Sequence, residues 1–333
     1  MEEKNTLKDM VNLPKTLMYS MHDFLNTHDL WHKKIALGFS GGPDSLYLLH
    51  HLAPFHQSQK ISLLAVHIDH EWRKDSFKDA AFCADQAAAL KIPFINIAAS
   101  SVSFTKKYNG SLEEMGRLLR RTVFEDLLNR KMVEYIALAH HFDDQQETFF
   151  IRMLRGTGIS GLSCMRSINK HYIRPLLNIS KQEILTYLLQ KKIPYLTDDT
   201  NDSPLFLRNR IRKKVIPALK DIDTRFDQSF KTMLEHIQLL DTFIQKEVDT
   251  LLMSYKAQKN RFSINVFLNL CDPFRYDLLI KILIYHGIPF TPSKGLIKEI
   301  ERFLKNTKQN GRHILYDQWN LYKKNGFMWI EKQ

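Results

Sequence analysis

Short apolar runs of strand length alternate with helical patterns through the first half of the chain. The runs cover residues 35–39, 61–68, 94–98 and 135–139. Each is followed by a segment whose apolar residues recur at helical spacing. This alternation predicts a parallel sheet covered by helices on both faces. Ligands bind such sheets at the carboxyl ends of the strands, so the residues that follow each run are the candidates for chemistry.

The first run ends in a turn of small residues that opens a helix. Its six residues are Ser40, Gly41, Gly42, Pro43, Asp44 and Ser45. Two glycines let the backbone approach a ligand closely, and the free N–H groups of a helix start attract phosphate. The alternative is a plain connection between a strand and a helix. The turn lacks the Gly-Lys-Ser/Thr of a Walker A loop and the third spaced glycine of a dinucleotide fingerprint.

A second polar segment follows the fourth run, where residues 139–148 read Ala-His-His-Phe-Asp-Asp-Gln-Gln-Glu-Thr. If a helix begins near Asp143, then Asp144, Glu147 and Thr148 share one of its faces. This predicts an acidic, titratable pocket. One alternative is a helix start whose Asp residues only favour the helix dipole. Another is a metal site formed by His140, Asp144 and Glu147.

The second run also ends in polar residues, His67 to His70, which include Asp69. Together with residues 40–45 and 140–144, three segments bring polar side chains to one rim of the predicted sheet. This convergence follows from the topology alone.

Charge and cysteine content limit the classes of function. The 333-residue chain carries a formal net charge of +12. This excess favours a polyanionic partner, most simply a nucleic acid, although a basic protein without such a partner is the alternative. The three cysteines form neither a CxxC pair nor a disulfide framework, which favours a reducing compartment and no structural zinc.

The sequence also bears on the cellular compartment and on the oligomeric state. No apolar run approaches the ~18 residues of a membrane span. The first residues show no apolar signal core, so we expect a cytoplasmic protein. The sequence does not determine the oligomeric state, and a homodimer is one of the possible states.

The chain is expected to form two domains. Residues 1–217 form the α/β domain, with a helical lead-in over 1–32, and residues 218–333 form a smaller, mostly helical C-terminal domain. A basic loop at 155–162 and a basic cluster at 208–214 precede the boundary near Pro217. Beyond it, a long helix is predicted over 226–252 and two short strands over 314–330, joined at an Asn-Gly turn.

The motifs together resemble a known family. The turn at 40–45 resembles the SGGxDS pyrophosphate loop of ATP pyrophosphatases. Over residues 30–217 the chain resembles the tRNA(Ile)-lysidine synthetases, a family of this PP-loop superfamily. The segments that carry the likeness are Ser40–Ser45, His67–His70, Arg117–Arg120, His140–Thr148, Arg152–Gly156 and Arg208–Arg212.

This resemblance implies an adenine nucleotide alpha hydrolase-like fold and a reaction in two steps. ATP adenylates the C2 oxygen of the wobble cytidine in a CAU-anticodon tRNA(Ile), and pyrophosphate leaves. The ε-amine of free L-lysine then attacks C2 and displaces AMP, which gives lysidine. ATP and Mg²⁺ are the implied cofactors.

The resemblance also implies roles for single residues around the nucleotide. Residues 40–45 hold the nucleotide phosphates, and Asp44 also holds Mg²⁺, a cation that prefers oxygen ligands. A helix cap is the alternative for Asp44. Arg120 stabilises developing negative charge, its alternative being a solvated helix charge. Asp69 contacts the nucleotide or lysine.

Lysine must be recognised as an ammonium and then deprotonated, because its reference pKa is near 10.4. Asp144 and Glu147 are the predicted lysine-binding carboxylates. Either His140 or Asp144 takes the proton. His141 is interpreted as an ordinary histidine at a strand end.

Basic residues are the implied contacts to the tRNA backbone. They are Arg152, Arg155, Arg208, Arg210 and Arg212. For Arg208 and Arg210 the alternative is that they orient the catalytic domain. The mixture of lysines and aromatic residues over 319–329 is assigned to the rest of the tRNA.

The chain departs from the family pattern at several positions. The family commonly has HVDHGLR where this chain has Glu71 and Trp72 after His70. Gly116 and Arg121 stand where Ala and Tyr are usual. The alternative functions are another PP-loop enzyme, such as a tRNA thiolase or an amide-forming synthetase, and a non-catalytic nucleic-acid-binding protein. The missing CxxC pair argues against the thiolase.

Overall fold

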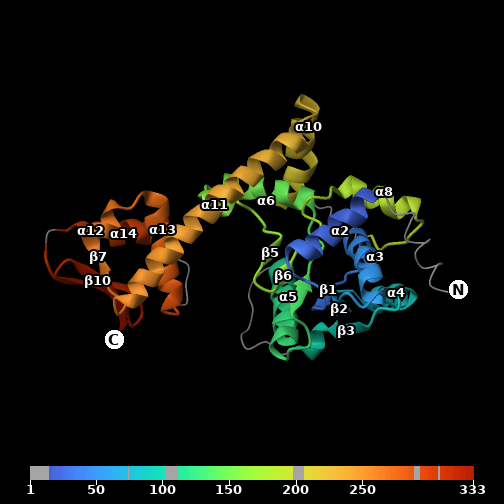
Figure 1. Cartoon of the computed structure of the whole chain (residues 1–333), viewed down its shortest axis with the longest axis horizontal. Coiled ribbons are helices and arrows are strands. Elements are labelled where there is room, and N and C mark those ends of the chain that lie inside the picture. Colours follow the sequence, from blue (N-terminus) through green and yellow to red (C-terminus); the bar gives the residue numbers. More distant parts are fainter. Residues whose placement is uncertain (1–14, 74, 103–111, 198–205, 289–292, 307) are drawn as a thin grey trace. The chain divides into compact units, whose positions relative to one another are not determined.

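The structure, a computed structural model, describes residues 15–73, 75–102, 112–197, 206–288, 293–306 and 308–333. The chain divides into two compact units (Figure 1). Unit 1 comprises residues 1–151 and 164–218, and unit 2 comprises residues 152–163 and 219–333. The segment 152–163, which the sequence assigned to the α/β domain, therefore belongs to unit 2.

Unit 1 is built on a six-stranded sheet in the order β3-β2-β1-β4-β6-β5. The first five strands in that order pair in parallel, and β5 pairs antiparallel with β6 at the edge. The strands are β1 (Lys34–Gly38), β2 (Ser62–Asp69), β3 (Phe94–Ala98), β4 (Tyr135–Ala137), β5 (Ile168–Asn169) and β6 (Tyr172–Ile173).

Helices cover both faces of this sheet, as the sequence predicted. Ile35 and Leu37 of β1 join one core with residues of α2, α3, α4 and α8, whereas Ala36 joins the other core with residues of α5. Successive side chains of a strand point to opposite faces, so a buried strand reads as a continuous apolar run. The helices of unit 1 are α2 (Lys15–Thr27), α3 (Pro43–Gln57), α4 (Ser76–Ala89), the 3₁₀ turn η2 (Ala99–Ser101), α5 (Leu112–Asn129), α6 (Phe142–Leu154), α8 (Lys181–Gln190), α9 (Leu207–Arg210) and the π-helical turn η4 (Ile211–Val215).

The sequence located the main strands and helices, with errors at their ends, and it did not predict β5, η2, α9 or η4. α3 starts at Pro43, a residue whose fixed φ suits the first turn of a helix. Of the expected lead-in, α2 is described, and residues 1–14 lie outside the described residues. Helical structure continues past the expected boundary at Pro217, because α10 (Ile216–Ile222) follows η4 directly.

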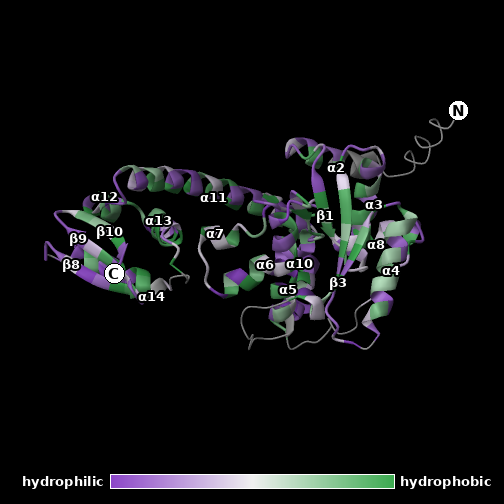
Figure 2. Ribbon diagram, turned by 90° about the horizontal axis from the view of Figure 1, so that it is seen from below, coloured by the Kyte–Doolittle hydropathy of each residue, from purple (hydrophilic) through white to green (hydrophobic). Residues whose placement is uncertain are grey.

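Unit 2 combines helices with a second sheet. Its long helix α11 (Phe226–Ala257) shows alternating hydrophobic and hydrophilic residues along its length (Figure 2). The core of this unit gathers apolar residues from α11, α12, α13, α14 and the sheet. The remaining elements are α7 (Ile159–Leu162), β7 (Phe262–Ser263), α12 (Ile264–Asn269), α13 (Asp272–Tyr285), α14 (Lys294–Lys305), β8 (Gly311–Tyr316), β9 (Trp319–Lys324) and β10 (Phe327–Lys332).

The sequence predicted two short C-terminal strands, which is fewer than the structure has. Four strands pair antiparallel in the order β7-β10-β9-β8. The predicted turn between β9 and β10 is confirmed, since Asn325 and Gly326 have φ of 52° and 78°, which a type I′ hairpin requires. β7 has only two residues, too few to show a strand period. Among the described residues, no helix is long and apolar enough to cross a membrane.

Candidate active site

The sheet order places the candidate site between β1 and β4. β1 pairs with β2 on one side and with β4 on the other, so the strand order reverses there. In open α/β sheets the crevice outside such a reversal is the usual ligand site. The turn 40–45 follows β1 and the segment 140–148 follows β4, so two of the predicted segments meet at this point.

The turn after β1 is held in one conformation by its own polar groups. Ser45 Oγ donates to the carbonyl of Gly42 at 3.0 Å and lies 3.3 Å from Ser40 Oγ. Gly41 has φ of 76°, and its carbonyl accepts a hydrogen bond of 2.9 Å from the N–H of Leu196. The turn therefore opens α3 with a fixed backbone, as an anion site requires.

Gly41 has no room for a side chain. A Cβ there would lie 2.7 Å from Leu196 Cδ1 and 2.9 Å from Cys83 Sγ, whereas at Gly42 the nearest atom would be 3.4 Å away. We expect Gly41→Ala to lower the free energy of unfolding by about 1–3 kcal/mol more than Gly42→Ala does, because it adds strain at positive φ to the clash. Urea unfolding of both variants measures the difference, and equal stabilities would contradict this account.

Asp44, in the first turn of α3, pairs with a lysine that the sequence did not single out. Lys181 Nζ lies 2.5 Å from Asp44 Oδ1. The N–H of Lys181 also donates to Asp143 Oδ2 at 2.8 Å. Lys181 is the first residue of α8, a helix that begins with a capping box between Ser180 and Glu183. The only signal in the sequence was that helix start.

His141 lies among three carboxylates. Its ring nitrogens are 3.8 Å from Asp44, 3.6 Å from Asp143 and 3.5 Å from Asp144. Burial alone would lower the pKa of His141, but these carboxylates outweigh it and raise that pKa. The interpretation of His141 as an ordinary strand-end histidine missed this position at the centre of the acidic cluster.

The predicted lysine-binding carboxylates are paired with arginines. Arg208 Nη2 donates to Asp144 at 2.6 Å, and its Nε donates to Glu147 at 2.5 Å. Arg212 Nε donates to the other oxygen of Glu147 at 2.5 Å. The side chain of Glu147 is only 1% exposed. Two of the predicted tRNA contacts thus point into the acidic cluster.

The basic cluster therefore has two sides. Arg208 and Arg212 are four residues apart and bind carboxylates of α6, although the side chain of Arg212 stays half exposed, whereas Arg210, Lys213 and Lys214 are exposed. Arg152, in the last turn of α6, donates to the carbonyl of Gly161 at 2.6 Å. Arg155 is exposed.

His140 is neutral in its surroundings. Burial lowers its pKa to about 4, a shift that Asp144 opposes and that Arg174, Arg208 and Arg120 reinforce. Arg120 thus lies within electrostatic reach of His140, as the prediction that Arg120 belongs to the site requires. Burial, with the charge of Arg120 as the next cause, also lowers the pKa of His70.

Asp69, at the end of β2, holds the turn that follows it. Its Oδ1 accepts from the N–H of Glu71 at 2.8 Å, and its Oδ2 accepts from Ser76 Oγ at 3.1 Å. Both carboxylate oxygens are thus engaged within the turn. The predicted contact of Asp69 with the nucleotide stays a prediction.

Two buried histidines predict a dependence of stability on pH. Burial lowers the pKa of His51, as of His140, to about 4. In the unfolded chain a histidine binds its proton at a pH near 6.5. Between pH 6.5 and 4 the unfolded chain therefore binds more protons than the native state, and the free energy of unfolding decreases as the pH is lowered. Each imidazole contributes up to about 1.4 kcal/mol per pH unit. We expect the urea midpoint to fall over this range and to fall less steeply in His51→Phe; parallel curves would contradict it.

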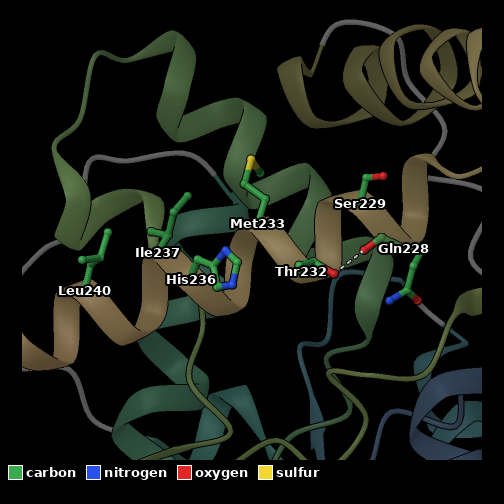
Figure 3. A pocket seen from close by; sticks show the side chains of 7 residues that line it. All are labelled: Gln228, Ser229, Thr232, Met233, His236, Ile237 and Leu240. Atoms are coloured by element: carbon green, nitrogen blue, oxygen red, sulfur yellow. Dashed lines mark hydrogen bonds between the residues drawn. The ribbon is translucent and has the colours of Figure 1, made fainter.

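A shallow hollow in unit 2 is separate from this chemistry. It is lined by one stripe of α11 between Gln228 and Leu240, where Thr232 Oγ1 donates to the carbonyl of Gln228 (Figure 3). None of the predicted catalytic residues lines it. The candidate active site is therefore the rim between β1 and β4 of unit 1.

A parallel sheet with a Ser-Gly-Gly turn at its strand-order reversal defines a nucleotide-binding α/β protein of the PP-loop class. Residues 14–219 match the family described as PP-loop domain. The tRNA(Ile)-lysidine synthase of Petrotoga mobilis is 35% identical over 209 residues, which cover 62% of this chain and 67% of that protein. The chain therefore belongs to the PP-loop domain family and, within it, to the tRNA(Ile)-lysidine synthase family.

Other relatives extend the match into unit 2. The tRNA(Ile)-lysidine synthase of Bacillus subtilis is 31% identical over 311 residues, or 88% of this chain, and that of Bacillus anthracis is 30% identical over 310 residues, or 89%. The chain spans 65% of the length of either relative. Among solved structures, the U34-tRNA thiolase NcsA from Methanococcus maripaludis has a TM-score of 0.55 at 17% identity over 67% of this chain and 80% of its own, a likeness of fold.

Proposed function

We propose that this chain is an ATP-dependent ligase that joins free L-lysine to C2 of the wobble cytidine of CAU-anticodon tRNA(Ile), in the cytoplasm. The observation that carries the proposal is the meeting of the Ser-Gly-Gly turn with an acidic helix start at the reversal of strand order. One segment suits pyrophosphate and the other suits an ammonium. The names of the relatives support the substrate.

In the first step the cytidine C2 oxygen bonds to the α-phosphorus of ATP, and the bond to pyrophosphate breaks. The fixed turn at 40–45 would hold the departing pyrophosphate through its backbone N–H groups. Lys181, 2.5 Å from Asp44, would add a positive charge beside it.

The residues of the turn also fit a Mg²⁺ ion carried on the triphosphate. Mg²⁺ keeps water and phosphate oxygens and needs only one or two protein carboxylates, and Asp44 offers one. Its Oδ2 lies 3.8 Å from His141, so this oxygen is engaged more weakly than Oδ1. The metal would neutralise phosphate charge.

In the second step the bound ammonium loses a proton, the lysine nitrogen bonds to C2, the bond from C2 to the AMP oxygen breaks, and a second proton leaves the nitrogen. Asp144 is the better candidate to hold the ammonium, because its side chain is 13% exposed and that of Glu147 is 1% exposed. His140 is neutral at pH 7 and is the proposed acceptor of the second proton; its pKa of about 4 makes it a weak base, so it acts only after bond formation to C2 has made the nitrogen acidic. Glu147 would then contribute to lysine binding indirectly, because it holds Arg208 and Arg212 beside Asp144.

The exposed side of the basic cluster is the better candidate for tRNA. Arg210, with Lys213 and Lys214, presents charge to solvent next to the site. Phosphate contacts of this kind give affinity and register. Arg208 and Arg212 are proposed to position the carboxylates, and Arg152 and Arg155 keep their proposed contact with tRNA. A homodimer stays a prediction that analytical ultracentrifugation can check.

Incubation with ATP, radiolabelled lysine and CAU-anticodon tRNA(Ile) tests the function. We expect ATP-dependent incorporation of lysine, with AMP and pyrophosphate as products. The same tRNA with a GAU anticodon is the matched control and should take up no label. Failure of folded protein to label the CAU tRNA would overturn the proposal. Tight tRNA binding without any reaction would indicate a non-catalytic binding protein, and thiolation of the tRNA with a sulfur donor would indicate the thiolase.

A further inference from the structure

The turn after β2 is unusually well fixed for an exposed segment. Glu71 has φ of 55°, a left-handed conformation that non-glycine residues seldom adopt. Its carboxylate accepts from the N–H of Ser100 at 2.6 Å and from Ser100 Oγ at 3.0 Å. Asp69 binds the same turn from the other side. The residue that follows, Trp72, is therefore presented from a rigid support.

Trp72 is stacked on a histidine and remains open on its outer side. Its ring centroid lies 4.6 Å from that of His70, with 23° between the planes. Trp72 is nevertheless 49% exposed. A large aromatic ring that is held on one face and exposed on the other is a stacking surface.

Gly116 makes room for this arrangement. A Cβ at that position would lie 3.0 Å from Trp72 Cη2 and 3.3 Å from His70 Cε1. The two departures from the family pattern, Trp72 and Gly116, are therefore in contact, and an alanine at 116 would force the ring to move. Gly116 thus leaves the space that the Trp72 ring needs in order to stack on His70.

The helix under Trp72 presents arginines on its exposed face. Arg117, Arg120 and Arg121 are exposed on α5, three and four residues apart, and Arg121 is paired with Glu125 at 2.7 Å. Arg120 Nε donates to the carbonyl of Gly116 at 3.3 Å, so this arginine lies beside the support of the ring. The ring therefore adjoins Arg120, the arginine that is predicted to belong to the candidate active site.

We propose that the outer face of Trp72 is a stacking platform for one nucleobase of the RNA substrate, next to the cytidine that reacts. This inference rests on the proposed RNA substrate. A base splayed from an anticodon loop can stack on an aromatic ring, while guanidinium groups take the adjacent phosphates. Arg117 and Arg120, three residues apart on α5, suit the successive phosphates of a polymer, so we assign the platform to RNA and not to the adenine of ATP.

The test measures binding of a 17-nucleotide CAU anticodon stem-loop and, separately, of α,β-methylene-ATP. We expect Trp72→Leu to weaken RNA binding by about 5- to 100-fold, the effect of losing one stacked base, and to leave the ATP analogue unaffected. Trp72→Phe should retain most of the affinity. Trp31→Leu, which alters an aromatic residue of the same unit that packs on Phe55, is the control and should not change RNA affinity.

Two further readouts separate stacking from a merely structural role. Gly116→Ala should weaken RNA binding by about 3-fold in the wild-type background and should have no effect in Trp72→Leu, because it acts through the ring. RNA should also quench tryptophan fluorescence in the wild type more than in Trp72→Phe. Thermal unfolding confirms that each variant is folded.

Each contrary result has a distinct meaning. RNA affinity unchanged in a folded Trp72→Leu variant would overturn the platform and leave the proposed function intact. Weaker binding of the ATP analogue with unchanged RNA affinity would reassign the ring to adenine and also overturn it. A wild-type chain that binds no RNA would overturn the proposed function and the platform together.

Discussion

Asp44→Ala is expected to reduce pyrophosphate release by at least about 10³-fold, with the protein still folded. The substitution removes the carboxylate that pairs with Lys181 at 2.5 Å and faces His141 at the phosphate-binding turn. Lys181 would then carry an uncompensated charge, and the proposed Mg²⁺ would lose its protein ligand. A coupled assay of pyrophosphate in the presence of ATP and tRNA measures the loss.

Asp79→Ala is the matched control for this variant. Asp79 also lies in the first turn of a helix that follows a strand, and it pairs with Arg73 at 2.6 Å and not with a residue of the acidic cluster. We expect its pyrophosphate release to stay within about 2-fold of the wild type, as for an exposed ion pair. Similar rates in Asp44→Ala and the wild type would remove Asp44 from the mechanism.

Glu147→Gln is expected to lower the free energy of unfolding by about 3 kcal/mol, because it breaks a buried ion pair and leaves two arginines with one partner fewer. Glu147 is 1% exposed and binds both Arg208 and Arg212. The half-exposed Arg212 keeps some contact with water, so the loss lies at the lower end of the range for buried pairs. Urea unfolding at pH 7 measures it.

Glu125→Gln makes the same chemical change in an exposed pair. Glu125 binds Arg121 at 2.7 Å one turn away on α5, and both side chains are about half exposed or more. The expected loss is within about 0.5 kcal/mol. Equal losses in the two variants would mean that Glu147 is not a buried anchor.

The sequence predicted those parts of the site that depend on local patterns. The strand before Ser40 and the strand before His140 are continuous apolar runs, and the topology of a parallel sheet brings their ends together. The segment at 140–148 showed its acidic helix face through spacing alone. These features need no knowledge of distant contacts.

Contacts between distant segments could not be predicted in the same way. Lys181 is 137 residues from Asp44, and Arg208 is 64 residues from Asp144. A run of basic residues at 208–214 does not reveal which members face α6. The contact of Trp72 with Gly116 was likewise visible only as two separate departures, until the turn after β2 and the helix α5 were in place.

The ion pairs around His141 have a consequence for how a charged substrate enters. Lys181, Arg208 and Arg212 pair with Asp44, Asp144 and Glu147, and these carboxylates together with Asp143 raise the pKa of His141. Most of the negative charge at the rim is thus already paired before any ligand arrives. The proposed lysine ammonium must therefore exchange with an internal cation, as a counterion does on an ion-exchange resin. Its affinity is then the difference between two ion pairs, which favours weak, rapidly reversible binding of the amine.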